Sequence, residues 1–117
     1  MKESILLKAS IEFSTKIINL VRKLKENKEN IISNQIGRSG TSIGANIHEA
    51  QYGNSKADFI SKLHIALKEA NETKYWLVLL RNSNYITESE YKILENDCEK
   101  IKAMLIKSLN TAKENQK

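Results

Sequence analysis

Three of the four glycines in this chain of 117 residues lie close together, at Gly37, Gly40 and Gly44, and the chain contains no proline. Glycine and proline shape most tight turns, so a chain with so few of them favours helices joined by short connections. The glycine window, residues 35–50, reads QIGRSGTSIGANIHEA. It is either a glycine-rich loop that holds phosphate or a helix that packs closely against a neighbour.

The length and composition predict one soluble, cytoplasmic domain. A chain of 117 residues is long enough to bury a core without disulfides or metals. The N-terminal sequence MKESILLKASIEF is interrupted by charges and lacks the apolar run of a signal peptide. No stretch approaches the roughly 20 apolar residues of a membrane span. Cys98 is the single cysteine, which fits a reducing compartment and excludes an intrachain disulfide.

Apolar residues recur every three or four positions in four segments, which predicts helices over residues 2–25, 31–51, 56–81 and 88–109. Short connections between such helices are typical of neighbours that run antiparallel. The predicted fold class is therefore all-α, an up-down-up-down four-helix bundle forming one domain over residues 1–117.

The predicted helix ends rest on cap and turn residues. Gly53 is placed to end the second helix, and Asn54 or Ser55 to begin the third. Thr87 with Glu90 has the spacing of a capping box, and Ser55 with Asp58 is a weaker example. The tail TAKENQK, residues 111–117, is expected to fray.

The first predicted helix carries two apolar stripes. One follows Leu6, Ala9, Phe13, Ile17, Leu20 and Leu24, and suffices for the core of a bundle. Leu7, Ile11 and Ile18 form the second stripe, about 120° away around the helix. Because the second stripe needs a partner, it predicts an interface with another copy of the protein.

The glycine window does not match the known phosphate-binding loops. No lysine follows the glycines as a P-loop requires, and the spacing G-x-x-G-x-x-x-G differs from the dinucleotide fingerprint. On a helix, Gly37, Gly40 and Gly44 fall beside a stripe of isoleucines. Each helical glycine costs on the order of 1 kcal/mol relative to alanine. The glycines therefore predict close packing, within the bundle or across a subunit boundary, with ligand contact through exposed backbone as the alternative.

No group of residues has the spacing of a catalytic or metal site. His48 and His64 lie on different segments, and neither belongs to an H-E-x-x-H motif. Glu69 and Glu72 lack the histidine of a bundle di-iron site and are expected to form salt bridges or to cap polar groups. Cys98 lies on an apolar stripe, where cysteine is usually inert. We therefore expect no enzyme activity, no metal and no cofactor.

The formal net charge is +5, with the excess in residues 1–30 and 55–82. Such an excess indicates either a solvated basic surface or one that binds nucleic acid. Tyr75 and Trp76, beside Lys74, are expected either to fill a subunit interface or to stack on a ligand. Asn46 is expected in a local polar network or a binding site. The predicted nucleic-acid-binding residues are Lys8, Lys16, Lys23, Arg38, Lys62 and Arg81.

Three pieces of the two central helices carry a family resemblance: RS-x-x-SIGANI-x-EA at residues 38–50, S-K-x-DF at 55–59 and ALKEANETKYWL at 66–77. Together they resemble the small four-helix bundle proteins encoded in intervening sequences of bacterial 23S ribosomal RNA genes. The same broad family includes the accessory variability determinant (Avd) proteins of diversity-generating retroelements. The outer helices match only in length and amphipathic pattern.

The resemblance implies a bundle assembled into a homopentameric ring with a non-enzymatic role. In the retroelement branch it implies binding to nucleic acid and to a reverse transcriptase. We expect a non-catalytic, oligomeric bundle that binds RNA, DNA or a nucleic-acid enzyme through a basic surface. The alternative is a protein–protein scaffold that binds no nucleic acid.

Overall fold

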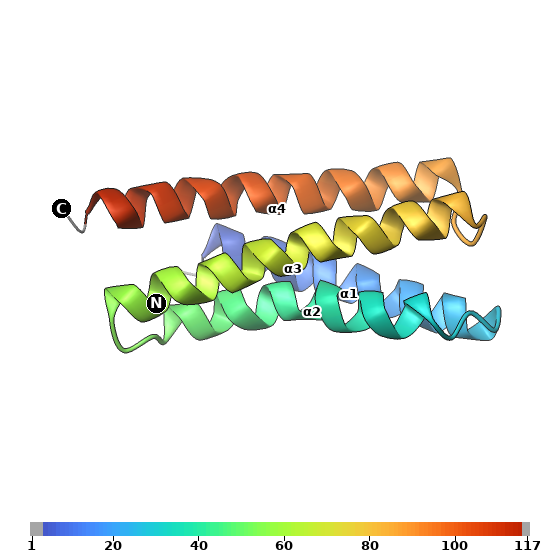
Figure 1. Cartoon of the computed structure of the whole chain (residues 1–117), viewed down its shortest axis with the longest axis horizontal. Helices are drawn as coiled ribbons and strands as arrows, with labels where there is room; N and C mark the ends of the chain where they lie inside the picture. Colours follow the sequence, from blue (N-terminus) through green and yellow to red (C-terminus); the bar gives the residue numbers. More distant parts are fainter. Residues whose placement is uncertain (1–3, 116–117) are drawn as a thin grey trace.

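The computed structural model describes residues 4–115, which form four α-helices (Figure 1). The helices are α1, Ile5–Glu26; α2, Ile32–Gln51; α3, Lys56–Asn82; and α4, Glu88–Glu114. The described chain is all-α, as the sequence predicts. Residues 2–3 of the first predicted helix and residues 116–117 of the tail lie outside the described residues.

The C-terminal segment differs from the prediction. Helix α4 continues to Glu114, well beyond the predicted end at residue 109. Leu109 and Ala112 are both buried, at 3% and 5% exposure. The expectation that residues 111–114 fray is therefore wrong, because the apolar spacing continues into the tail and docks it on the core.

The helices form an elongated bundle of 49 × 23 × 20 Å. Helix α2 lies against α1 and α3, helix α4 lies against α3 and α1, and the α1/α4 contact is the least extensive. Figure 1 shows the connections 27–31 and 83–87 at one end of the bundle and the connection 52–55 at the other. Helices α1 and α3 are diagonally opposite, so their outer sides face different directions.

The core is made from the predicted stripes, because residues three and four apart share one helix face. Ala9, which was expected on the first stripe of α1, is only half-buried, as are Ile32 and Phe59 at the edges of the core. The large apolar side chains with less than 2% exposure are Phe13, Ile17, Leu24, Ile36, Ile43, Ile47, Leu63, Leu77, Leu80 and Leu105.

The glycine window lies within α2 and faces α1. A Cβ atom added at Gly40 would lie 2.9 Å from two side-chain carbons of Ile17. One added at Gly44 would lie 3.2 Å from the hydroxyl oxygens of Ser10 and Ser14. The glycines therefore let the backbone of α2 approach α1, which confirms close packing within the bundle.

Two connections share one turn geometry at the ends of α1 and α3. Lys28 and Asn84 both have a φ of 63°, in the left-handed region that favours glycine. The next residue in each turn, Glu29 or Tyr85, donates its backbone N–H five residues back, to Leu24 or Leu80. This is the Schellman pattern, which satisfies carbonyls at a helix end. Gly53 follows the C-cap residue Tyr52, so it lies directly beyond the end of α2 as predicted, and its φ is not positive.

The helix starts depend on side-chain caps. The Ser55 hydroxyl accepts the N–H of Asp58, and Thr87 forms a reciprocal capping box with Glu90, as predicted. The start of α2 was predicted to within one residue, but the residue that caps it was not. The Glu29 side chain, at 5% exposure for the residue, accepts the N–H groups of Ile31 and Ile32. This carboxylate replaces a conventional cap, because Ile31 at the N-cap position offers no side-chain acceptor.

Candidate nucleic-acid interface

Two of the predicted phosphate-binding lysines on α1 form ion pairs with α4. Lys16 Nζ lies 2.6 Å from Asp97 Oδ2, and Lys23 Nζ pairs with Glu90. The pKa of the Glu90 carboxyl is lowered, mainly by the hydrogen bond that Lys23 donates to it. Each carboxylate offsets the positive charge that its lysine would present to a phosphate.

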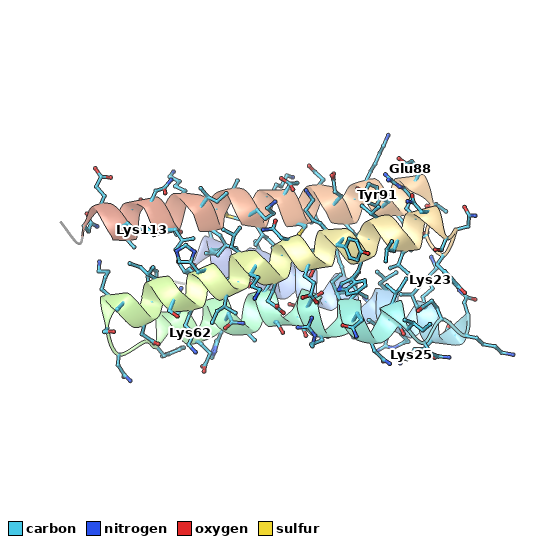
Figure 2. All side chains as sticks on the ribbon, viewed as in Figure 1. Lys23, Lys25, Lys62, Glu88, Tyr91 and Lys113 are labelled. Carbon is cyan, nitrogen blue, oxygen red and sulfur yellow. The ribbon has the colours of Figure 1, made fainter. Side chains whose placement is uncertain are left out.

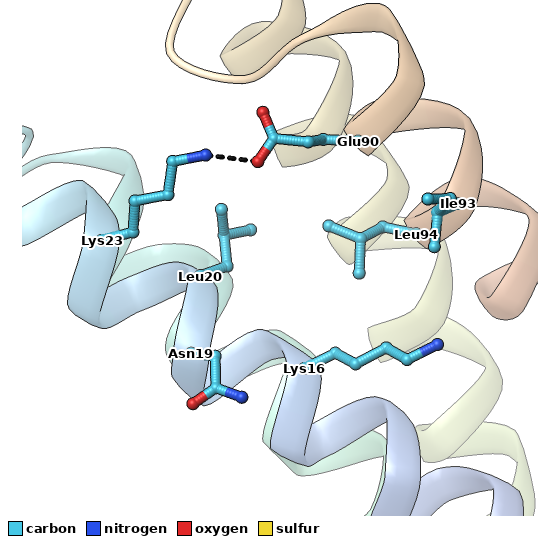
Figure 3. A pocket seen from close by; sticks show the side chains of 7 residues that line it. All are labelled: Lys16, Asn19, Leu20, Lys23, Glu90, Ile93 and Leu94. Atoms are coloured by element: carbon cyan, nitrogen blue, oxygen red, sulfur yellow. Dashed lines mark hydrogen bonds and ion pairs between the residues drawn. The ribbon is translucent and has the colours of Figure 1, made fainter.

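A shallow surface hollow of about 280 Å³ lies between α1 and α4. Figure 3 shows Leu20 and Leu94 facing each other across it, with the Lys23–Glu90 pair on one side and Lys16 on the other. The hollow lies where the helix–helix contact is least extensive. Its lining is mainly apolar, so it offers no convergent set of phosphate ligands.

Arg38 of α2 joins two carboxylates of α3. Its Nη1 donates to Glu69 Oε2 at 2.8 Å, and its Nη2 donates to Glu72. Trp76 Nε1 also donates to Glu72 Oε2, at 3.2 Å. Because the Glu69 side chain is only 12% exposed, the guanidinium compensates a carboxylate that has lost most of its hydration. The predicted salt bridges of Glu69 and Glu72 are thus confirmed, and Arg38 is less available to a phosphate.

The other predicted cations lie apart from this network. Arg81 stacks over the Tyr91 ring, 4.1 Å from its centroid, and lies 3.9 Å from Glu88. Lys8 is exposed and Lys62 half-buried, and neither forms an ion pair within residues 4–115. The structure therefore does not gather the six predicted cations into one patch.

The polar residues beside the isoleucine stripe of α2 are used in packing. Ser39, expected at the edge of that stripe, is fully buried and accepts a hydrogen bond from Thr73 at 2.9 Å. Asn46 Nδ2 donates to the Ser42 carbonyl at 2.8 Å, so this amide belongs to a local contact. Every buried side-chain oxygen or nitrogen in the described part of the chain has a hydrogen-bond partner.

The two apolar features predicted for interfaces differ in exposure. On α1, Leu7 is half-buried, whereas Ile11 and Ile18 are 51% and 49% exposed. On α3, Tyr75 is 57% exposed and contacts the edge of the half-buried Trp76 ring, with centroids 5.1 Å apart. Leu7 packs against the core, whereas Ile11 and Ile18 leave apolar surface exposed in the described chain, as the predicted role of this stripe in assembly requires.

Of the other titratable groups, Lys74 and Glu99 are paired, Cys98 is buried and the two histidines are exposed. Lys74 donates a hydrogen bond to the Glu99 carboxylate, and this bond is the main reason that the pKa of Glu99 is lowered. Burial raises the pKa of the Cys98 thiol to about 12, so it stays protonated at neutral pH. His48 and His64 are exposed. Within residues 4–115, no group of three or more His, Cys, Asp or Glu side chains is placed to hold a metal ion.

Sequence reasoning missed the exposed lysines of α4. Residues 83–117 are neutral by formal charge, and a count per segment conceals how the charges are arranged around the helix. In the structure, Lys92, Lys100 and Lys107 are exposed, whereas the neighbouring carboxylates turn toward α1 and α3. The helical position of each charge relative to the apolar stripe was the signal that could have found them.

No helix in the described range is both long enough and apolar enough to cross a membrane.

A comparison with curated proteins found no match. The family model of the 23S rRNA-intervening sequence protein matches residues 2–107. A crystal structure of a protein of unknown function from the S23 ribosomal protein family, from Bacteroides thetaiotaomicron VPI-5482, is similar, with a TM-score of 0.88. It is 52% identical, and the alignment covers 90% of this chain and 98% of that one. The chain belongs to the 23S rRNA-intervening sequence protein family.

Proposed function

We propose that this protein is a non-catalytic, up-down-up-down bundle that assembles with copies of itself and binds nucleic acid, or a nucleic-acid enzyme, through a basic surface. The proposal rests on the positive charge that remains exposed after the ion pairs are formed. Ion pairs use Lys16, Lys23, Arg38 and Lys74, yet the chain retains a net charge of +5 and many exposed lysines without a carboxylate partner. Exposed cations of this kind attract phosphates and make binding sensitive to salt.

Assembly through α1 would multiply this charge. Ile11 and Ile18 expose apolar surface that a second copy could cover, and the proposed assembly is a homopentameric ring. Five copies would carry about +25 formal charges, so a weak contact per chain would become a multivalent one. A reverse transcriptase is the kind of nucleic-acid enzyme that this proposal includes as a partner, and the cytoplasm is the proposed compartment.

A non-catalytic role agrees with how the reactive groups are held. The carboxylates of Glu69, Glu72 and Glu99 are bound in ion pairs, and the Cys98 thiol is buried. A nucleophile or a general base needs an accessible group whose pKa suits its task. These groups instead stabilise contacts between helices.

The proposal is tested by fluorescence anisotropy with labelled RNA and DNA duplexes of equal length, titrated with the protein across a salt series. We expect binding that weakens as salt rises, with a slope on a logarithmic plot of about −0.9 for each phosphate contacted on duplex DNA. An oligomer that binds neither probe at low salt would contradict nucleic-acid binding. That outcome would instead favour a protein–protein scaffold, for which the exposed Ile11 and Ile18 are the supporting observation.

A further inference from the structure

Helix α4 separates its charges around its circumference. Between Ser89 and Lys113, every exposed residue is either uncharged or a lysine. The four acidic residues in that interval are all less exposed, and they are Glu90, Glu95, Asp97 and Glu99. Helix α4 as a whole, Glu88–Glu114, carries five lysines and six acidic residues, and the exposed Glu88 and Glu114 lie at its two ends, so its outward side is positive between them.

The contacts of the carboxylates explain the separation. Glu90 and Asp97 pair with lysines of α1, on one side of α4. On the other side, Glu99 pairs with Lys74 of α3 and with Lys102 of its own helix. These carboxylates hold α4 to its neighbours, so they do not lie on its outward side.

Helix α3 also keeps its acidic residues away from its exposed side. From Lys56 to Asn82, no exposed residue is acidic. Glu69 and Glu72 are held by Arg38 of α2, and Asp58 lies half-buried in the first turn of the helix. The outward side of α1 differs, because Glu12 and Glu26 are exposed among its lysines.

We propose that the outward side of the α3–α4 hairpin is the surface that contacts the phosphodiester backbone of nucleic acid. We call it the lysine face, formed by Lys56, Lys68, Lys92, Lys100, Lys107 and Lys113. Figure 2 shows Lys113 projecting from α4 near the start of α3. This inference rests on the proposed function and assigns that function to one side of the bundle. It does not compete with assembly through α1, because neither Ile11 nor Ile18 lines the hollows that contain Lys100 and Lys107.

The lysines of α4 have the spacing of a phosphate contact row. Lys92, Lys100 and Lys107 are eight and seven residues apart, which corresponds to about 10–12 Å along a helix. A duplex carries about one negative charge per 1.7 Å of its axis, so each lysine in such a row can meet a different part of a dense array of phosphates. None of the three lysines has a carboxylate oxygen within 4.0 Å in the described structure.

Two carboxylates share a hollow with Lys100, and one of them is already bound by another lysine. Lys100 shares a shallow hollow with Glu12, Lys16 and Asp97, and the Asp97 carboxylate is already bound by Lys16. Lys107 shares another hollow with Lys56 of α3, which carries the positive surface from α4 to the start of α3. The charge on the lysine face thus remains available to a phosphate.

The test compares two triple variants with the same loss of charge. One is Lys92→Gln, Lys100→Gln, Lys107→Gln on the lysine face, and the matched control is Arg22→Gln, Lys25→Gln, Lys28→Gln at the end of α1 and in the turn that follows it. Duplex RNA and duplex DNA are titrated separately across a salt series, and circular dichroism verifies that both variants remain folded. For duplex DNA at about 0.1 M salt, we expect the lysine-face variant to lose at least tenfold in affinity, with a salt slope shallower by about 2–3.

The control variant should bind within about threefold of the wild type on each probe. The probe that loses more affinity in the lysine-face variant identifies the preferred nucleic acid. If both variants lose affinity equally, or only the control does, the lysine face is not the contact surface, although the proposed function survives. If the wild type binds neither probe, the proposed function and this inference both fail.

Discussion

The α1–α2 hairpin and the α3–α4 hairpin hold their helices together by different means. In the first, Gly40 and Gly44 bring the backbone of α2 against Ile17, Ser10 and Ser14 of α1, and no ion pair joins the two helices in the described range. The second is joined by Lys74–Glu99 at the surface, above apolar packing.

The difference determines what each hairpin presents to solvent. Packing through glycine uses no charge, so α1 keeps exposed acids and bases together with the exposed Ile11 and Ile18. On α3 and α4, carboxylates lie in the contacts between helices, and lysines remain on the exposed side. The same chain thus offers an apolar side for assembly and a positive side for an anionic partner.

The largest effect is expected from filling the glycine contact. In Gly40→Leu, even the first added carbon would lie 2.9 Å from Ile17, so we expect the free energy of unfolding to fall by about 3 kcal/mol. Urea denaturation measures this change. The control is Ala45→Leu, an exposed position on the same helix, which should change stability by less than about 0.5 kcal/mol. Equal stability of the two variants would show that the α1/α2 contact is not close.

The second-largest effect is expected at Glu29, whose carboxylate caps the start of α2. Glu29→Ala removes the acceptor of the N–H groups of Ile31 and Ile32, and we expect a loss of about 2 kcal/mol. Thr87→Ala, which removes the cap of α4, should cost about 1 kcal/mol. The exposed Glu26 provides the control, since Glu26→Ala should be nearly neutral. Thermal unfolding ranks the three variants, and a neutral Glu29→Ala would contradict its role as a cap.

A smaller, stabilising effect is expected at the two left-handed turns. Lys28→Gly relieves a lysine at a φ of 63° and should raise the free energy of unfolding by about 0.5–1 kcal/mol. Asn84→Gly should gain less, because asparagine tolerates this conformation better. Chemical denaturation of both variants shows which substitution gives the larger gain in the free energy of unfolding. A larger gain at Asn84 would indicate that the two turns are not equivalent.

The smallest effect is the pH dependence of the α3–α4 contact. The pKa of Glu99 is lowered in the folded state, mainly by the hydrogen bond from Lys74, so its contribution is complete above the unfolded pKa. It is lost as pH falls through the unfolded and then the folded pKa. Because the Glu99 side chain is 44% exposed, we expect less than about 1 kcal/mol. Wild type and Glu99→Gln, compared from pH 7 to pH 3, should converge in stability at the acidic end, and a constant difference would contradict this cause.

The fold was predictable because the helical period of apolar residues is a local signal that tertiary packing reinforces. Ile43, Leu77 and Leu105 on the apolar stripes are buried, and the predicted caps Ser55 and Thr87 mark true helix starts, with the reciprocal capping box formed at Thr87. Glu29 was missed as a cap because its carboxylate reaches forward from a connection with no conventional capping pattern. Its charge alone suggested only solvent exposure.

The arrangement of the surface was harder to predict. Lys16 and Lys23 share one side of α1, but sequence spacing within a helix does not reveal which carboxylates of α4 face them. Arg38 was likewise separated in sequence from Glu69, its partner on α3. Charge pairing between helices depends on register and tilt, which one sequence leaves undetermined. The count of charges per segment favoured α1 and α3, whereas the structure also leaves lysines of α4 exposed.

Multi-angle light scattering of the purified protein, alone and with a ribosomal RNA fragment across a salt series, tests the central claim most directly. The account predicts an oligomer, a pentamer in the proposed assembly, that forms a heavier complex with RNA at low salt and releases it as salt rises. A monomer would contradict assembly through Ile11 and Ile18. An oligomer whose mass is unchanged by RNA at every salt concentration would contradict RNA binding through the basic surface.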